Sequence, residues 1–347
     1  MLEEIYKVAV IIPCWNSSSY IGEMLRCLLE QSFQDWRAFV VDDQSTDNSV
    51  KIVEKYHIKD ERISCVVRSR LPKGAQSCRN IGFEMSEGAE YVIWFDADDL
   101  IAPYCLWQRV AYMDRHPELD FGIFPAITFK KKIWEENAMC YGFPFFEDTF
   151  CAMMSWTLPM VGWTNIYRRK SVVAYGLRWD EKILSMQDSD FNIQSILLGL
   201  KFDYGVKEKA LVDYFYRTGQ NIGSTSSKLL MPEHIRSHLY LLNKVSNKMT
   251  KEQKRKYDKS LQLYHFKFAK FFKDSKEVYN SFLKLPWLQE NRWFKLKCIL
   301  WKCVHFQHTN NILLFRKLLY REYLETKNWH DLMNNQYKIL LENQSSK

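Results

Sequence analysis

Three carboxylates lie within four residues at Asp96, Asp98 and Asp99, directly after the apolar run YVIWF. Negative charges this close repel one another unless water screens them or a cation lies among them. Divalent ions such as Mg²⁺ bind carboxylate oxygens and keep other positions for water and substrate phosphates. The cluster therefore indicates a site for a metal-bound diphosphate. A solvated acidic turn before the next helix is the alternative interpretation.

Two other polar clusters follow apolar runs earlier in the chain. In DDQSTD, at 42–47, the carboxylate of Asp43 could accept a hydrogen bond from a nucleobase or a ribose hydroxyl, while its neighbours cap the next helix. Pro13, Trp15 and Asn16 end the first run, where the indole offers a flat face to a base and the amide offers a donor and an acceptor. Aromatic side chains after strands also pack in many cores, so this cluster alone is a weak indication.

The chain around these clusters alternates apolar runs with amphipathic segments. Apolar, β-branched runs predict strands at 7–12, 37–41, 62–68 and 91–95. Helical periodicity and capping residues predict helices at 19–31, 49–56 and 75–86. This alternation indicates an α/β fold with a mostly parallel sheet covered on both faces. Ligands of such sheets bind beyond the carboxyl ends of the strands, which is where all three polar clusters lie.

The overall composition points to a folded protein of a reducing compartment. The chain has 347 residues, of which 47% are hydrophobic, enough for a substantial core. Its nine cysteines are scattered and form no CxxC pair. The first residues lack the pattern of a secretory signal, and no run reaches the roughly 20 apolar residues that span a bilayer. We therefore expect a cytoplasmic protein, in solution or peripheral on the inner face of the cell membrane.

Charge divides the chain into two parts. Residues 1–230 carry 26 Lys and Arg against 31 Asp and Glu, whereas residues 231–347 carry 23 against 10. We expect a first, catalytic domain at 1–228 and a basic, aromatic-rich helical region at 229–347. The stretch 292–306 interleaves Trp, Phe and Leu with Lys, which suits either packing on the first domain or an anionic membrane surface. A nucleic-acid partner is not expected, because no known binding motif occurs and the first domain is acidic.

Four segments in order, VAVIIPCWN, VVDDQSTDNS, GAQSCRNIG and VIWFDADD, resemble the nucleotide-binding half of a family 2 glycosyltransferase. Two later segments support the resemblance. LSMQDSDF at 184–191 is similar to the family's acidic pair before a helix, and YFYR at 214–217 is similar to the tyrosine–arginine end of its catalytic domain. The resemblance covers about residues 5–225. It implies the GT-A fold, with a Rossmann-like, mostly parallel sheet, and a role in making bacterial cell-surface polysaccharide.

The resemblance also implies roles for individual residues. Those implied to bind the donor nucleotide are Pro13, Trp15, Asn16, Asp43, Arg79, Asp96 and Asp98. Arg79 would reach the base or the diphosphate. Asp98 would be the main ligand of Mn²⁺ or Mg²⁺, and Asp96 would contact the ribose or the metal. Asp99 would support these ligands or face the sugar.

The implied reaction is inverting transfer of a sugar from a nucleotide sugar, most often UDP-linked, to a hydroxyl of a glycan or lipid-linked glycan acceptor. Asp188 would be the general base. The family usually has glutamate at Gln187, so the sugar or acceptor contacts of that carboxylate do not carry over. Trp163, Thr164 and Asn165 are the candidate acceptor contacts, although core packing explains such aromatic residues equally well.

Two other functions stay open. The glutamine at 187 is compatible with a degenerate module that binds a sugar nucleotide without transferring the sugar. The pair Asp96-x-Asp98 is also similar to phosphotransferases with an aspartyl nucleophile, which place their motif near the N-terminus and would leave Arg79 and Asp188 without a role. A dinucleotide-dependent oxidoreductase is excluded, because no GxGxxG follows the first predicted strand.

Overall fold

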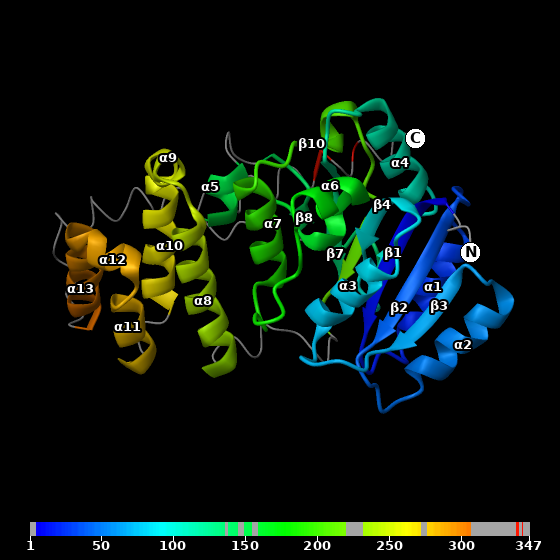
Figure 1. Cartoon of the computed structure of the whole chain (residues 1–347), viewed down its shortest axis with the longest axis horizontal. Helices are drawn as coiled ribbons and strands as arrows, with labels where there is room; N and C mark the ends of the chain where they lie inside the picture. The colour runs from blue at the N-terminus through cyan, green and yellow to red at the C-terminus, as the bar shows by residue number, and fades with distance from the viewer. Residues whose placement is uncertain are drawn as a thin grey trace.

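A computed structural model describes residues 5–135, 138–144, 149–154, 159–219, 232–271 and 276–306, together with 338, 339 and 342. In this part of the chain, two sheets with their covering helices stand beside a group of C-terminal helices (Figure 1). The α/β class and the mostly parallel central sheet expected from the sequence are confirmed. None of the described helices is long and apolar enough to cross a membrane.

The first four strands make one half of the central, seven-stranded sheet. They run parallel in the order β4-β1-β2-β3. These strands are β1 (Tyr6–Cys14), β2 (Trp36–Asp42), β3 (Ile63–Val67) and β4 (Ala89–Trp94). The helices between them are α1 (Ile21–Leu29), α2 (Ser49–Lys59) and α3 (Ala75–Glu84). Every strand and helix predicted for this half exists, with ends displaced by a few residues.

From Val8 to Cys14, strand β1 is apolar because both of its faces are covered. Val8 and Val10 belong to the apolar cluster that includes residues of α1, and Ile11 belongs to the cluster on the other face. All three side chains are fully buried, as expected for a central parallel strand. On α3, a Cβ at Gly82 would collide with Ile11, so glycine lets this helix pack directly on the strand.

The other half of the central sheet mixes strand directions. Its strands are β6 (Phe121–Ile123), β9 (Asn165–Arg168) and β10 (Phe202–Tyr204). Strand β9 is antiparallel to both of its neighbours, β4 and β6. The helical elements of this region are α4 (Cys105–Arg115), α5 (Thr149–Met154), the 3-10 turn η1 (Gly162–Thr164), α6 (Arg169–Ala174), α7 (Gln187–Leu197) and the 3-10 turn η2 (Gly205–Glu208).

A second, smaller sheet lies against the acidic turn at 96–99. Its order is β5-β11-β7-β8. The strands are β5 (Leu100–Ile101), β7 (Ala126–Phe129), β8 (Cys140–Tyr141) and β11 (Tyr214–Arg217). Strand β5 follows the turn directly and pairs antiparallel with β11, with Leu100 opposite Phe215. This pairing brings β11 next to the acidic turn, although more than a hundred residues separate them in sequence.

The described residues of the C-terminal region form helices, as the sequence predicts. Its helices are α8 (Pro232–Lys248), α9 (Lys251–Lys256), α10 (Asp258–Phe271), α11 (Lys276–Leu283), α12 (Pro286–Glu290) and α13 (Arg292–Phe306). In Figure 1 they continue outward from α7, with α8 nearest to it. One apolar cluster includes Trp94 and Phe191 of the first domain together with Leu242, Phe268 and Trp287 of these helices. The described C-terminal helices therefore pack on the part of the chain that forms the central sheet. The boundary expected after residue 228 lies outside the described residues.

Candidate active site

The acidic turn after β4 and the beginning of α7 are connected by Arg79 of α3. Its Nη2 donates a hydrogen bond to Oδ1 of Asp96 at 2.7 Å, and its Nη1 donates to Oε1 of Gln187 at 2.8 Å. The guanidinium lies over the ring of Trp179, 4.5 Å from the ring centroid. Because Asp188 directly follows Gln187, this buried cation lies between the predicted metal ligands and the predicted base.

Asp188 lies in the first turn of α7 and is held against η1. Its Oδ1 accepts a hydrogen bond from the backbone N–H of Gly162 at 2.9 Å. A Cβ at Gly162 would lie 2.6 Å from this oxygen and 2.8 Å from the ring of Trp179, so glycine is required for this contact. Burial raises the pKa of Asp188, Arg79 opposes that shift, and Asp96 adds to it. A half-buried carboxylate with a raised pKa suits a general base.

Asp99 supports the acidic turn from its buried side. Its carboxylate accepts hydrogen bonds from the phenol of Tyr214 at 2.5 Å and from the backbone N–H of Arg217 at 2.7 Å. Arg217 also donates from Nε to the backbone carbonyl of Asp98 at 2.7 Å. Burial, then the charges of Asp98 and Asp96, raises the pKa of Asp99 well above its usual range. Tyr214 and Arg217 of β11 thus hold the turn in place, while Asp96 and Asp98 remain partly exposed.

Asp96 and Asp98 together fit a divalent cation that takes its other ligands from a diphosphate and water. Burial, and after it the charge of the neighbouring Asp96, raises the pKa of Asp98 to about 6. A hard cation relieves the repulsion between these two carboxylates. Within the described ranges, no group of three or more His, Cys, Asp or Glu side chains is arranged to hold a metal, so protein groups alone do not complete such a site.

The residues expected on the nucleotide side lie at the ends of β1 and β2. Trp15 is half exposed, at 50%, whereas Pro13 is buried within β1 opposite Val41. The side-chain oxygen of Asn16 accepts a hydrogen bond from the backbone N–H of Thr46 at 2.8 Å, so part of this amide joins the two loops. Trp15 is thus the side chain of this group with a free aromatic surface.

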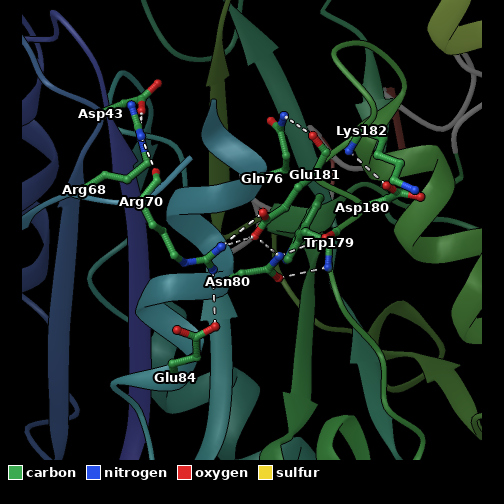
Figure 2. A network of polar contacts seen from close by, with 10 residues as sticks. All are labelled: Asp43, Arg68, Arg70, Gln76, Asn80, Glu84, Trp179, Asp180, Glu181 and Lys182. Atoms are coloured by element: carbon green, nitrogen blue, oxygen red, sulfur yellow. Dashed lines mark hydrogen bonds and ion pairs between the residues drawn. The ribbon is translucent and has the colours of Figure 1, made fainter. Parts of the chain in front are cut away.

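Asp43 already has two partners. Its carboxylate accepts a hydrogen bond from the backbone N–H of Gly74 at 2.9 Å. It also forms an ion pair with Arg68, which Figure 2 shows. A carboxylate has several acceptor positions, so Asp43 can still accept a hydrogen bond from a nucleobase in addition to these two partners. The sequence interpretation did not anticipate Arg68.

The residues expected to contact the acceptor, at 163–165, lie inside the protein. Thr164 and Asn165 are fully buried, and Asn165 donates from Nδ2 to Oδ1 of Asn192 at 3.0 Å inside the core. Trp163 is also buried, at 4% exposed, with its ring stacked on Tyr214 at 4.7 Å between centroids. The hydroxyl of Thr164 donates to the backbone carbonyl of Val161 at 2.7 Å, and Asn165 is covered because β9 lies between β4 and β6 in the sheet. Residues 163–165 therefore pack beneath the site, where Trp163 contacts Tyr214.

Gln76 and Trp179 were missed by the sequence interpretation. Gln76 accepts a hydrogen bond from Nε2 of Gln187 at 2.8 Å, and Trp179 lies under Arg79. Gln76 precedes Arg79 by three positions on α3, so helical spacing offered a signal that the two share a face. Trp179 comes from a distant segment, and no local pattern indicates its contact with Arg79.

The chain is similar in sequence to known glycosyltransferases. Residues 9–176 match the family model Glycosyl transferase family 2. The chain is 28% identical over 233 residues to the poly(ribitol-phosphate) beta-N-acetylglucosaminyltransferase TarS of Staphylococcus aureus. That alignment covers 65% of this chain and 38% of TarS, so the chain spans well under half of that relative's length.

The fold is similar to two solved structures. One is S. aureus TarS 1–349 in complex with UDP-GlcNAc, with a TM-score of 0.57 and 22% identity, covering 96% of this chain and 91% of that one. The other is the mannosyltransferase PcManGT from Pyrobaculum calidifontis in complex with GDP-Man and Mn²⁺, with a TM-score of 0.52 and 15% identity, covering 99% of this chain and 87% of that one. The chain therefore contains a glycosyltransferase family 2 domain over residues 9–176, and its similarity to the solved structures shows the GT-A fold.

Proposed function

We propose that this protein is an inverting glycosyltransferase that moves a sugar from a nucleotide sugar to a hydroxyl group of an acceptor glycan. The supporting observation is the position of Arg79, which bonds to Asp96 at 2.7 Å and to the residue before Asp188 at 2.8 Å. Sugar transfer needs a base for the acceptor hydroxyl and positive charge for the departing diphosphate. The arrangement brings both kinds of group to one end of the sheet.

In this proposal Asp188 accepts the proton of the acceptor hydroxyl as that oxygen attacks the anomeric carbon. General-base catalysis of this kind contributes about 10²–10⁴-fold to the rate. Attack from the face opposite the leaving group inverts the anomeric centre, so an α-linked donor gives a β-linked product. Arg79 holds positive charge beside the departing diphosphate. A divalent cation held by Asp98 and Asp96, Mn²⁺ or Mg²⁺, would add Lewis-acid neutralisation of the same charge.

We propose a UDP-linked donor and an acceptor of the cell-envelope polysaccharide type, free or lipid-linked. TarS, which has a similar fold, forms complexes with UDP and with UDP-GlcNAc, and its name describes transfer to poly(ribitol phosphate). The structure of PcManGT contains GDP-Man and Mn²⁺. It supports the proposal of a metal ion, although its nucleotide is a different one. In this chain, the exposed ring of Trp15 offers a stacking surface to the base.

Helix α13 supports a peripheral association with an anionic membrane. Trp293, Leu296 and Leu300 are 79%, 42% and 39% exposed and follow one another at i, i+3 and i+7, so they form one apolar stripe. Arg292 and Lys297 are exposed beside it. Each basic side chain near an anionic surface adds about 1 kcal/mol of attraction. Vesicle flotation tests this membrane association. Recovery of the wild-type protein with anionic vesicles, and loss of that recovery in Trp293→Glu, supports it. No recovery of the wild-type protein at low salt contradicts it.

The experiment that tests the function uses the full chain with Mn²⁺ and a panel of UDP- and GDP-sugars. Release of nucleoside diphosphate, with and without acceptor glycans, is measured for wild type and Asp98→Ala. We expect release from one donor class and its loss in the variant. Donor binding without release supports the binding module instead. Release of a sugar phosphate in place of a nucleoside diphosphate supports the phosphotransferase.

A further inference from the structure

Helix α8 of the C-terminal region binds both ends of the segment 180–190, which contains Asp188. The Nζ of Lys244 donates hydrogen bonds to Oδ2 of Asp180 at 2.6 Å and to Oδ2 of Asp190 at 2.7 Å. These two carboxylates flank Asp188 in sequence. The side chain of Lys244 is 12% exposed and that of Asp190 is 1% exposed, so solvent screens this pairing weakly.

The middle of the same segment is also held by α8. The backbone N–H of Leu184 donates to Oγ of Ser237 at 3.0 Å. The phenol of Tyr240 donates to Oδ2 of Asp180 at 3.1 Å. Ser237, Tyr240 and Lys244 follow one another at i, i+3 and i+7, so they lie on one face of the helix. That face of α8 therefore contacts the segment at its beginning, middle and end.

The other side of the segment is fixed to the nucleotide-binding half, as Figure 2 shows. Nδ2 of Asn80 donates to the backbone carbonyl of Trp179 and to Oε1 of Glu181, each at 2.9 Å. Nη1 of Arg70 donates to the same oxygen of Glu181 at 3.0 Å. The segment that leads to Asp188 is thus held between α3 and the C-terminal helix α8.

We propose that Lys244 and Ser237 position Asp188 for the transfer step, so that the C-terminal region completes the catalytic domain. This inference rests on the proposed function, in which Asp188 is the general base. A base must lie within hydrogen-bond reach of the proton that it accepts. Of the two carboxylates bound by Lys244, Asp180 precedes α7 and Asp190 lies in its first turn with Asp188, so the ammonium limits movement of that turn. A displacement of about 1 Å at a reacting group can cost about 10²-fold in rate.

The test uses the full chain with Asp180→Ala, Ser237→Ala and the double variant. These changes leave the buried pair of Lys244 and Asp190 intact, so the packing of α8 on α7 survives. We expect kcat of the double variant to fall about 10- to 100-fold, with donor KM and UDP affinity within about twofold of wild type. Parallel loss of kcat and UDP affinity would show general damage to the fold and would overturn the inference, as would an unchanged kcat.

A matched control and a rescue come from the same helix. Lys248 donates to Oε1 of Gln194 at 2.8 Å, farther along α7, so Lys248→Met removes the same charge without touching the segment. We expect its kcat within about twofold of wild type. Lys244→Met should lower kcat and Lys244→Arg should restore most of it, because a guanidinium can bridge two carboxylates. Equal effects of Lys244→Met and Lys248→Met would contradict a positioning role.

Hydrogen exchange separates this inference from the proposed function, because it needs no turnover. In the double variant, amides at 181–189 should exchange faster, while those of β1 should not change. Unchanged exchange at 181–189 would overturn the contacts as a restraint. Faster exchange together with full transfer by Asp188→Asn would instead overturn the role of Asp188 in the proposed function.

Discussion

The phenol of Tyr214 donates a 2.5 Å hydrogen bond to Oδ2 of Asp99, on the buried side of the acidic turn. The same phenol oxygen accepts the backbone N–H of Asp96 at 3.2 Å. Two hydrogen bonds from β11 therefore act on the turn that presents Asp96 and Asp98. The geometry of the proposed metal ligands depends on a strand that is remote in sequence.

Replacing Tyr214 with phenylalanine should destabilise the protein and weaken metal-dependent nucleotide binding. The change leaves the buried carboxylate of Asp99 with one partner fewer, which costs about 1–3 kcal/mol of unfolding free energy. Urea unfolding measures that cost, and calorimetric titration of UDP with Mn²⁺ measures the binding. Tyr216→Phe is the control, because Tyr216 stacks on the same indole of Trp163 at 5.3 Å between centroids. Equal effects of both variants would show that the bond to Asp99 has no special role.

Gly162→Ala should lower the transfer rate more than it lowers donor binding. The new Cβ would lie 2.6 Å from Oδ1 of Asp188, so the carboxylate or η1 must move. Steady-state kinetics with a donor titration separates kcat from KM. Gly22→Ala is the control: its Cβ would meet Ile52 of α2 at an ordinary distance of 3.7 Å, and alanine favours a helix such as α1 by about 0.5–1 kcal/mol. A Gly162→Ala enzyme with wild-type kcat would show that the close contact is dispensable.

Stability should depend on pH through Asp98. Burial, then Asp96, raises the pKa of this carboxyl from 3.8 to about 6. Because the folded state keeps the proton to a higher pH than the unfolded state, the stabilisation is present below about pH 4 and is lost as pH rises through about 6. We expect the unfolding free energy of wild type, relative to Asp98→Asn, to fall over this range in the presence of a chelator. A flat or rising difference would contradict the shift.

Mn²⁺ should reverse this trend. The cation competes with the proton for the same carboxylate, so metal binding strengthens as Asp98 ionises. The thermal shift caused by Mn²⁺ with UDP should therefore be larger above about pH 6 than below about pH 5. Asp98→Asn should show little dependence on pH in this measurement. A larger shift at the lower pH would count against Asp98 as a ligand.

The buried pair of Arg109 and Asp213 should be among the contacts that the fold needs most. Nε and Nη2 of the arginine donate to the two oxygens of the aspartate at 2.9 and 2.7 Å, and neither side chain is exposed. Asp213→Ala leaves a buried guanidinium without its counter-charge, which costs about 3–5 kcal/mol. Glu208→Gln breaks the exposed pair with Arg115 and should cost less than about 1 kcal/mol. Urea unfolding compares the two, and similar costs would contradict the prediction.

Local patterns predicted the first half of the sheet, because strands β1 to β4 are apolar runs that follow one another in the chain with only one helix between each pair. The acidic turn was predicted from its place after an apolar strand, whereas the role of Asp188 comes from the family resemblance and stays a prediction. The burial of Asn165 could not be predicted, since it depends on β9 inserting between β4 and β6. The contacts of Lys244 could not be predicted either, because a lysine on a basic helix is normally solvated and its two partners, Asp180 and Asp190, are more than 50 residues away in sequence.

The central claim is that Asp188 takes the acceptor proton, and one pair of measurements on Asp188→Asn tests it most directly. Asparagine keeps the shape and can still accept a hydrogen bond from Gly162, so the fold and the donor site should persist. We predict that transfer to the acceptor falls at least about 10²-fold while the dissociation constant for the nucleotide sugar changes less than about twofold. Transfer at the wild-type rate in that variant would contradict the account.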